Sequence, residues 1–137
     1  MLPVNRLFII AAFGIIVLTL YSCSSTGSNM DRQIHIENVS LNDVTIEIWD
    51  KESSNSMDVN PTIAIDKEKF QRIDVGESIE FSAGDIKGNY RANKPDRLFL
   101  YEIERDSAYY RQSFDIAPGT DELTIQQKGS VYSLQQN

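Results

Sequence analysis

Apolar and polar residues alternate along most of the chain from residue 32 onward. The segment 32–39 (RQIHIENV) alternates Ile34 and Ile36 with polar residues, and the segment 43–50 (DVTIEIWD) has an aliphatic residue at positions 44, 46 and 48. This period of two is typical of a β-strand with one buried face. The residues between the two segments are polar turn formers, so the two strands are predicted to pair as a hairpin.

The rest of the chain continues as short strands separated by turns. Residues 73–81 predict a second hairpin around Gly76, and residues 66–73 suit one or two helical turns. Residues 51–60 and 84–96 are predicted loops, and further strands are predicted at residues 62–65, 97–104, 108–116, 122–127 and 130–135. The pattern therefore predicts an all-β domain at residues 32–137, a single antiparallel β-sandwich or small barrel of about seven to nine short strands.

Two strands depart from simple alternation. Trp49 lies on the polar face of its strand, where it is either an exposed anchor for a partner or folded under the loop 51–60. Residues 97–104 are apolar on both faces, with Leu98 and Leu100 on one face and the aromatic side chains on the other. Since a sandwich strand usually has one covered face, the second face is expected to be covered by residues 66–73 or by another protein.

Tyrosine is concentrated in the second half of the chain, where it offers stacking area together with a hydroxyl group. Such side chains suit contact with a glycan or a protein. The residues predicted to bind a partner are Trp49, Leu98, Leu100, Tyr109 and Tyr132.

The first 22 residues differ from the rest. Arg6 precedes the apolar run LFIIAAFGIIVLTL at residues 7–20, which has 14 residues and no charge. A helix that spans a bilayer needs about 20 residues. The segment therefore predicts a cleaved secretory signal peptide at residues 1–22, with a transmembrane helix as the alternative.

The only cysteine of the chain follows this run. Leu20-Tyr21-Ser22-Cys23 resembles the lipobox of bacterial lipoproteins, although Tyr21 is unusual at its position. The resemblance implies cleavage before Cys23, a diacylglyceryl group on its thiol and a further acyl chain, such as palmitate, on its amine. Several acyl chains give stable membrane anchoring. Ser24 in place of an aspartate resembles the pattern that directs lipoproteins to the outer membrane, where the domain would face the periplasm.

A small polar segment, residues 23–31 (CSSTGSNMD), connects this cysteine to the β domain. It is predicted to be a flexible tether. Its nine residues reach about 30 Å at most, at roughly 3.3 Å per residue. The domain is therefore expected to lie close to its membrane.

Charge and composition exclude several functions. The 137 residues carry 13 basic and 20 acidic side chains, and removal of residues 1–22 with Arg6 leaves 12 against 20, a net charge of −8. This balance disfavours nucleic-acid binding and adhesion of the protein surface to anionic lipid. With one cysteine, one histidine (His35, in a strand and expected to face solvent) and no nucleotide-binding motif, the sequence predicts no catalytic residue, no metal site and no cofactor.

One short motif remains. Residues 128–132 (KGSVY) resemble the SGxxY motif of the C-type lysozyme inhibitors of the bacterial envelope, since Gly129 and Tyr132 match while Lys128 replaces the serine. The second motif and the paired cysteines of that family are missing.

These observations predict a non-catalytic binding or scaffolding lipoprotein of the cell envelope, with a membrane contact through its lipid and a protein partner. The alternative is an inhibitor of a cell-wall hydrolase, followed by a glycan-binding lipoprotein or an enzyme.

Overall fold

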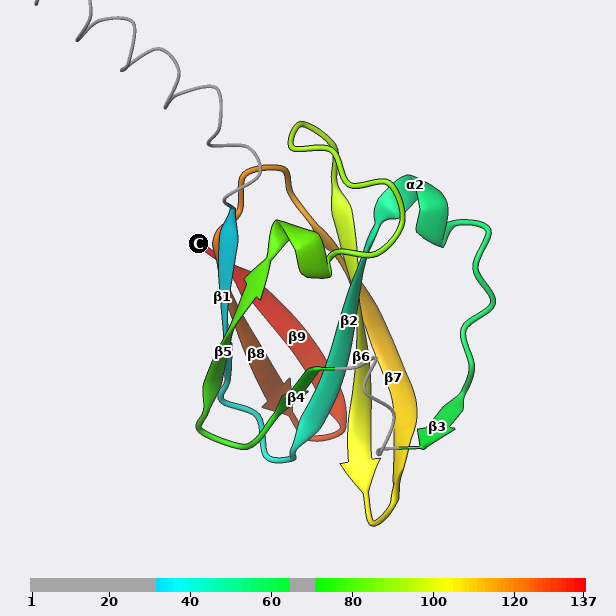
Figure 1. Ribbon diagram of the computed structural model, residues 1–137. Coiled ribbons are helices and arrows are strands. Elements are labelled where there is room, and N and C mark those ends of the chain that lie inside the picture. The colour runs from blue at the N-terminus through cyan, green and yellow to red at the C-terminus, as the bar shows by residue number, and fades with distance from the viewer. Residues whose placement is uncertain (1–31, 65–70) are drawn as a thin grey trace, which may run out of the picture. The chain divides into compact units, whose positions relative to one another are not determined.

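The computed structural model describes residues 32–64 and 71–137 (Figure 1). The predicted signal peptide, Cys23 and the tether lie outside these residues. The described chain forms nine strands, one short α-helix and one 3-10 helix. The elements are β1 (Gln33–Asn38), β2 (Val44–Asp50), α2 (Lys51–Ser54), β3 (Thr62–Ala64), β4 (Gln71–Ile73), β5 (Ser78–Ser82), η1 (Ala83–Asp85), β6 (Asp96–Glu104), β7 (Ser107–Ile116), β8 (Glu122–Lys128) and β9 (Val131–Gln136).

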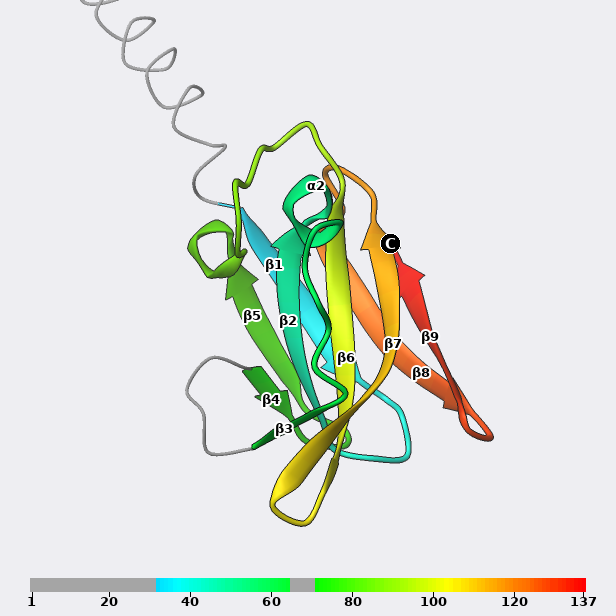
Figure 2. The same cartoon turned by 90° about the vertical axis from the view of Figure 1, so that its right-hand side faces the viewer.

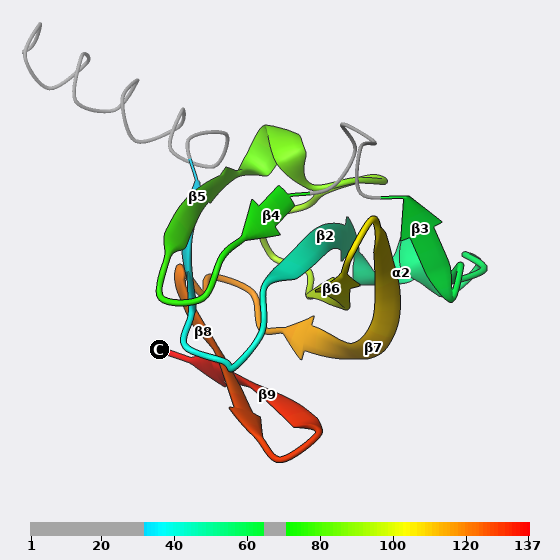
Figure 3. The same cartoon turned by 90° about the horizontal axis from the view of Figure 1, so that it is seen from below.

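The strands form two sheets that face each other, as the view from below shows (Figure 3). The first sheet has the order β5-β1-β8-β9, and the second has the order β3-β7-β6-β2-β4. All neighbouring strands are antiparallel except β1 and β8, which run parallel. The prediction of an all-β sandwich is confirmed, and the sheets do not close into a barrel. Within the described ranges, no helix is long and apolar enough to cross a membrane.

Both predicted hairpins are wrong, because each pair of strands is divided between the two sheets. β1 and β2 lie in different sheets, and so do β4 and β5. The buried side chain of Asn38 stabilises the crossing, since its Nδ2 donates to the backbone oxygens of Asn42 and Ile73 at 2.9 Å each. The backbone oxygen of Asn38 also accepts a hydrogen bond from the backbone N–H of Gly76 in the second connection. Alternation correctly located these strands but not their partners.

Between the sheets lies one hydrophobic core. Every second residue of the central strands points into it, as the period of two requires. The fully buried members include Ile34, Ile36, Val44, Ile46, Ile48, Leu98, Leu100, Ile116 and Ile125. The predicted alternation of buried and exposed faces is thus confirmed for β1 and β8, whereas β2 and β6 are buried on both faces.

A second, smaller cluster covers the outer face of the second sheet. Phe99, Tyr101 and Ala108 are buried there. The chain between α2 and β3 crosses this face in front of β6 (Figure 2). We call this segment together with the first two residues of β3, residues 55–63, the strap, because its apolar side chains pack on the cluster. These are Met57, Val59 and Ile63.

Residues 51–73 differ in part from the expectation. The predicted loop at residues 51–60 begins with the helical turn α2, which is capped by Asp50. The predicted strand after it is confirmed as β3. Helical turns were predicted at residues 66–73. Residues 66–70 lie outside the described residues, and residues 71–73 form the strand β4 instead of a helix.

Candidate functional site

Leu98 and Leu100 are not surface residues, contrary to the expectation that they bind a partner. Both are fully buried in the main core. β6 lies in the middle of its sheet, with the core on one face and the strap on the other. The second apolar face of this strand is therefore covered by the strap. The expected cover at residues 66–73 lies outside the described residues up to residue 70.

Trp49 is partly buried and packs against the second cluster together with Met57 and Val59 of the strap, which favours the alternative that it folds under the loop 51–60. Its ring packs with the second cluster, and Nζ of Lys87 lies 5.9 Å from the ring centroid. Its buried indole N–H has no hydrogen-bond partner among the described residues. Trp49 is therefore part of the packing of the second sheet and not an exposed anchor.

Tyr132 is also a core residue, with only 2% of its surface exposed. Its hydroxyl donates to Oε2 of Glu102 at 2.9 Å and accepts from Nδ2 of Asn42 at 3.2 Å. Burial raises the pKa of Tyr132 to about 12, so the hydroxyl stays protonated at neutral pH. Of the two residues that carried the resemblance to lysozyme inhibitors, Tyr132 is thus turned into the domain, whereas Gly129 is exposed.

Tyr109 on β7 is the only exposed residue among the five predicted to bind a partner, with 37% of its surface exposed. The structure does not bring the five residues together on one surface. No group of three or more His, Cys, Asp or Glu side chains able to hold a metal ion occurs in residues 32–64 and 71–137.

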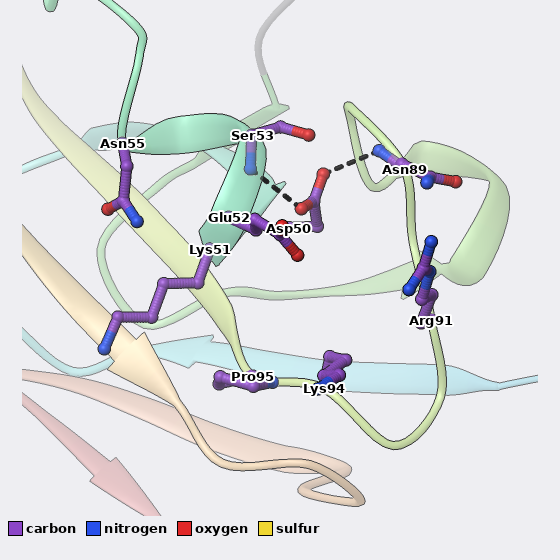
Figure 4. Close-up of a pocket in the computed structure, with 9 residues that line it drawn as sticks. All are labelled: Asp50, Lys51, Glu52, Ser53, Asn55, Asn89, Arg91, Lys94 and Pro95. Carbon is purple, nitrogen blue, oxygen red and sulfur yellow. Dashed lines mark hydrogen bonds between the residues drawn. The ribbon is translucent and has the colours of Figure 1, made fainter.

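The sequence did not predict a concave site that the structure shows, a pocket of about 480 Å³ at one end of the sandwich. We call it the end pocket. The start of α2 forms one side and the loop before β6 forms the other (Figure 4). Its lining residues are Asp50, Lys51, Glu52, Ser53, Asn55, Asn89, Arg91, Lys94 and Pro95.

Backbone pairing holds this loop beside β2. The N–H of Lys87 donates to the oxygen of Ile48, and the N–H of Asp50 donates to the oxygen of Lys87. The side chain of Lys87 also forms an ion pair of 2.8 Å with the buried carboxylate of Glu47. The loop is thereby fixed next to the last residues of β2, where the pocket begins.

The carboxylate of Asp50 joins the two sides of the end pocket. Its Oδ1 accepts the N–H of Ser53 at 2.9 Å, and its Oδ2 accepts the N–H of Asn89 at 2.6 Å (Figure 4). Burial acts to raise the pKa of Asp50, but the hydrogen bonds from Ser53 and Asn89 and the charge of Arg91 outweigh it and lower the pKa. Asp50 is therefore ionised at neutral pH, and each of its oxygens is already occupied by a backbone donor.

Gly88 permits this close approach of the loop to α2. Its φ is +87°, a left-handed conformation that favours glycine. A Cβ atom at this position would overlap Oδ2 of Asp50 and lie 2.8 Å from Cβ of Ser53. The position thus requires glycine for its backbone conformation and for the space.

The lining of the end pocket carries three cations, Lys51, Arg91 and Lys94, and two acids, Asp50 and Glu52. Residues 86–95 (IKGNYRANKP) contain Lys87, Arg91 and Lys94 and no acidic residue. Arg91 and Lys94 are exposed, and neither forms an ion pair with any described residue. The third cation of the lining, Lys51, is held by Asp115, with 2.8 Å between Nζ and Oδ2.

A buried ion pair lies at the same end of the sandwich. Nη1 of Arg32 lies 3.2 Å from Oδ2 of Asp96, and its Nη2 donates to the backbone oxygen of Thr120. Burial raises the pKa of Asp96 to about 6 even though the charge of Arg32 acts to lower it. Asp96 is also directly opposite Asp50 in the pairing of β6 with β2. The first described residue of the chain is thus held beside the end pocket.

Comparisons of the chain with protein-family models, with curated proteins and with solved structures found no match.

Proposed function

We propose that this chain is a lipid-anchored lipoprotein of the bacterial cell envelope, in which the β-sandwich is a non-catalytic binding module for another envelope component. The proposed anchor is Cys23, and the proposed location is the outer membrane with the domain facing the periplasm. The lipobox-like sequence at residues 20–23 supports the anchor. Multiple acyl chains would make the attachment stable.

The observation that carries the binding role is the end pocket. Ligand sites are concave, largely preformed and supplied with a few polar groups that orient the ligand. The end pocket has these properties, because Asp50 and Gly88 fix its two sides while Arg91, Lys94 and Asn55 remain exposed at its mouth. The apolar side chains of β6 support no binding role, since the chain covers them itself.

The anchor is tested by the substitution Cys23→Ser. Loss of the thiol removes the only position for a thioether-linked lipid, so the protein should become soluble or stay uncleaved. Membrane fractionation and intact-mass measurement would show this. A variant that is cleaved normally and still sediments with the membrane would contradict the lipoprotein proposal.

The binding role is tested by photo-crosslinking in the native envelope, with the reactive side chain placed at Glu52. Glu52 is exposed and lines the end pocket, while Val131 is exposed at the hairpin between β8 and β9 and serves as the control position. A discrete adduct with one protein or lipid at Glu52 and none at Val131 is expected. The absence of an adduct at Glu52 in a membrane-bound, folded protein would contradict binding at this pocket.

A further inference from the structure

We propose that the end pocket binds the phosphate-bearing headgroup of an anionic lipid in the same membrane that holds the anchor. This inference rests on the proposed function, because it names the envelope component that the pocket would contact. Three independent observations support it: the position of the pocket, the local charge and the state of the polar groups in its lining.

The position of the pocket follows from the contacts of Arg32. This residue precedes β1 and contacts Asp96, Tyr90 and Thr120, which surround the end of the sandwich where the pocket lies. In Figure 1 the start of β1, α2 and the loop before β6 all lie at the top of the domain. The residues that lead to Cys23 therefore join the domain at the end that carries the pocket.

The distance to the membrane is limited by chain length. Only nine residues, 23–31, separate the proposed lipid attachment from Arg32. Fully extended, they reach about 30 Å, at roughly 3.3 Å per residue. The pocket end of the domain is thus the part of the described chain that is closest, along the chain, to the lipid headgroups.

The local charge differs from the charge of the whole chain. The chain is acidic, yet the loop at residues 86–95 carries Lys87, Arg91 and Lys94 and no acid. Lys87 is held by Glu47, so Arg91 and Lys94 are the cations of this loop that line the pocket. Net charge disfavours contact with an anionic membrane, and the attraction from these two side chains acts only within about 8 Å of the surface at physiological salt.

The polar groups of the lining suit a phosphate. The acidic Asp50 is shielded by two backbone donors, whereas Arg91 and Lys94 have no ion-pair partner among the described residues. Arginine binds phosphate through two parallel hydrogen bonds, and lysine binds it as a point charge. Glu52 is exposed in the lining and opposes an anion, and so does the ionised Asp50, whose carboxylate interacts with the charge of Arg91. Arg91 and Lys94 must outweigh both acids for a phosphate to bind.

The experiment uses the full-length, lipidated protein in vesicles. A dye is attached to an Asn93→Cys variant, in the loop of the pocket, or to an Asp106→Cys variant at the far turn; both residues are exposed. The vesicles contain phosphatidylcholine with or without phosphatidylglycerol. They also contain a trace of a lipid that carries a nitroxide on its headgroup. The nitroxide quenches the fluorescence of a dye that comes close to the headgroups, so quenching reports which end of the domain lies at the membrane. Quenching at position 93 should rise when phosphatidylglycerol is present, and quenching at position 106 should not.

The matched variants separate the pocket from general electrostatics. Arg91→Gln with Lys94→Gln should weaken the phosphatidylglycerol-dependent quenching about fivefold for each cation removed, given roughly 1 kcal/mol per cation at an anionic surface. Arg105→Gln with Lys128→Gln makes the same change in net charge away from the pocket and should leave the quenching unchanged. Excess glycerol 3-phosphate at constant ionic strength should compete with the headgroup and reduce the quenching.

Three results would overturn the inference: equal quenching with and without phosphatidylglycerol, no effect of the Arg91/Lys94 variant, or no competition by glycerol 3-phosphate. Failure of the proposed function is recognised separately. If Cys23 is acylated, the wild-type protein takes up no thiol-reactive dye, because Cys23 is its only cysteine. Labelling of the wild type would therefore reject the anchor without any result from the quenching.

Discussion

A single glycine determines how closely the two sides of the end pocket approach each other. Gly88 lies against Asp50 and Ser53, in a backbone conformation that other residues adopt only with strain. The carboxylate of Asp50 then satisfies one donor from α2 and one from the loop. The shape of the pocket is therefore set by contacts of a few atoms.

We predict that Gly88→Ala destabilises the domain more than Gly119→Ala. Both glycines have a positive φ, +87° and +80°, so the backbone strain is similar. A Cβ at Gly88 would collide with Asp50 and Ser53, whereas a Cβ at Gly119 meets nothing within 4 Å. The free energy of unfolding in urea should fall by about 1–2 kcal/mol for Gly119→Ala, from strain alone, and by at least about 2 kcal/mol more for Gly88→Ala. Equal losses would show that the loop has room to move away from α2.

At the scale of elements, the strap determines that the outer face of the second sheet is buried. β6 is a central strand whose outer face would be exposed without residues 55–63. The strap converts Phe99 and Tyr101 from surface residues into buried ones. Burial raises the pKa of Tyr101, and the neighbouring carboxylate of Glu47 raises it further.

Substitution of Phe99 tests whether the strap covers this face in solution. Phe99→Ala should lower the free energy of unfolding by roughly 3 kcal/mol or more, as expected for a large aromatic side chain in a core. Tyr109→Ala, on the neighbouring strand β7, should cost less than about 1 kcal/mol because Tyr109 is exposed. A small effect at Phe99, measured by urea denaturation, would mean that the strap is detached.

The two sheets are also joined at one end by charge. Arg32 precedes β1 of the first sheet, and Asp96 begins β6 of the second. Oδ1 of Asp96 has no hydrogen-bond partner within residues 32–64 and 71–137, and the carboxylate is almost fully buried. The free-energy cost of burying the ionised carboxylate exceeds the stabilisation that the ion pair with Arg32 provides. The pKa of Asp96 is therefore raised to about 6.

This raised pKa predicts how stability depends on pH. The carboxyl group of Asp96 has a pKa of 3.8 in the unfolded chain and about 6 in the folded domain, so its contribution to stability is complete below pH 4 and is lost as the pH rises through 6. The loss is up to about 3 kcal/mol, at 1.36 kcal/mol per pKa unit. Asp96→Asn removes this titration, so its stability relative to the wild type should increase between pH 4 and pH 7.

Urea denaturation of both proteins at several pH values measures the difference directly. Other carboxyl groups titrate in both proteins and cancel in the comparison. A relative stability that decreases with pH would mean that the ion pair with Arg32 outweighs the cost of burial.

The strands could be predicted from the sequence because alternation is a local property. Residues such as Ile34, Ile46 and Leu123 occupy alternating positions whatever strand lies beside them. The binding candidates could not be predicted in the same way. Trp49, Leu98 and Tyr132 stood out as large apolar or aromatic residues, but whether such a residue is exposed depends on what packs over it.

The sequence by itself determined the class of fold, the positions of most strands, the acidity of the chain and the lipobox-like motif on which the anchor proposal rests. Only the tertiary structure decided which strands are neighbours, what covers β6 and where the end pocket lies. The physical reason is sequence separation. The hydrogen bond from Asn89 to Asp50 spans 39 positions and that from Arg32 to Asp96 spans 64, so no local pattern of residues encodes either contact.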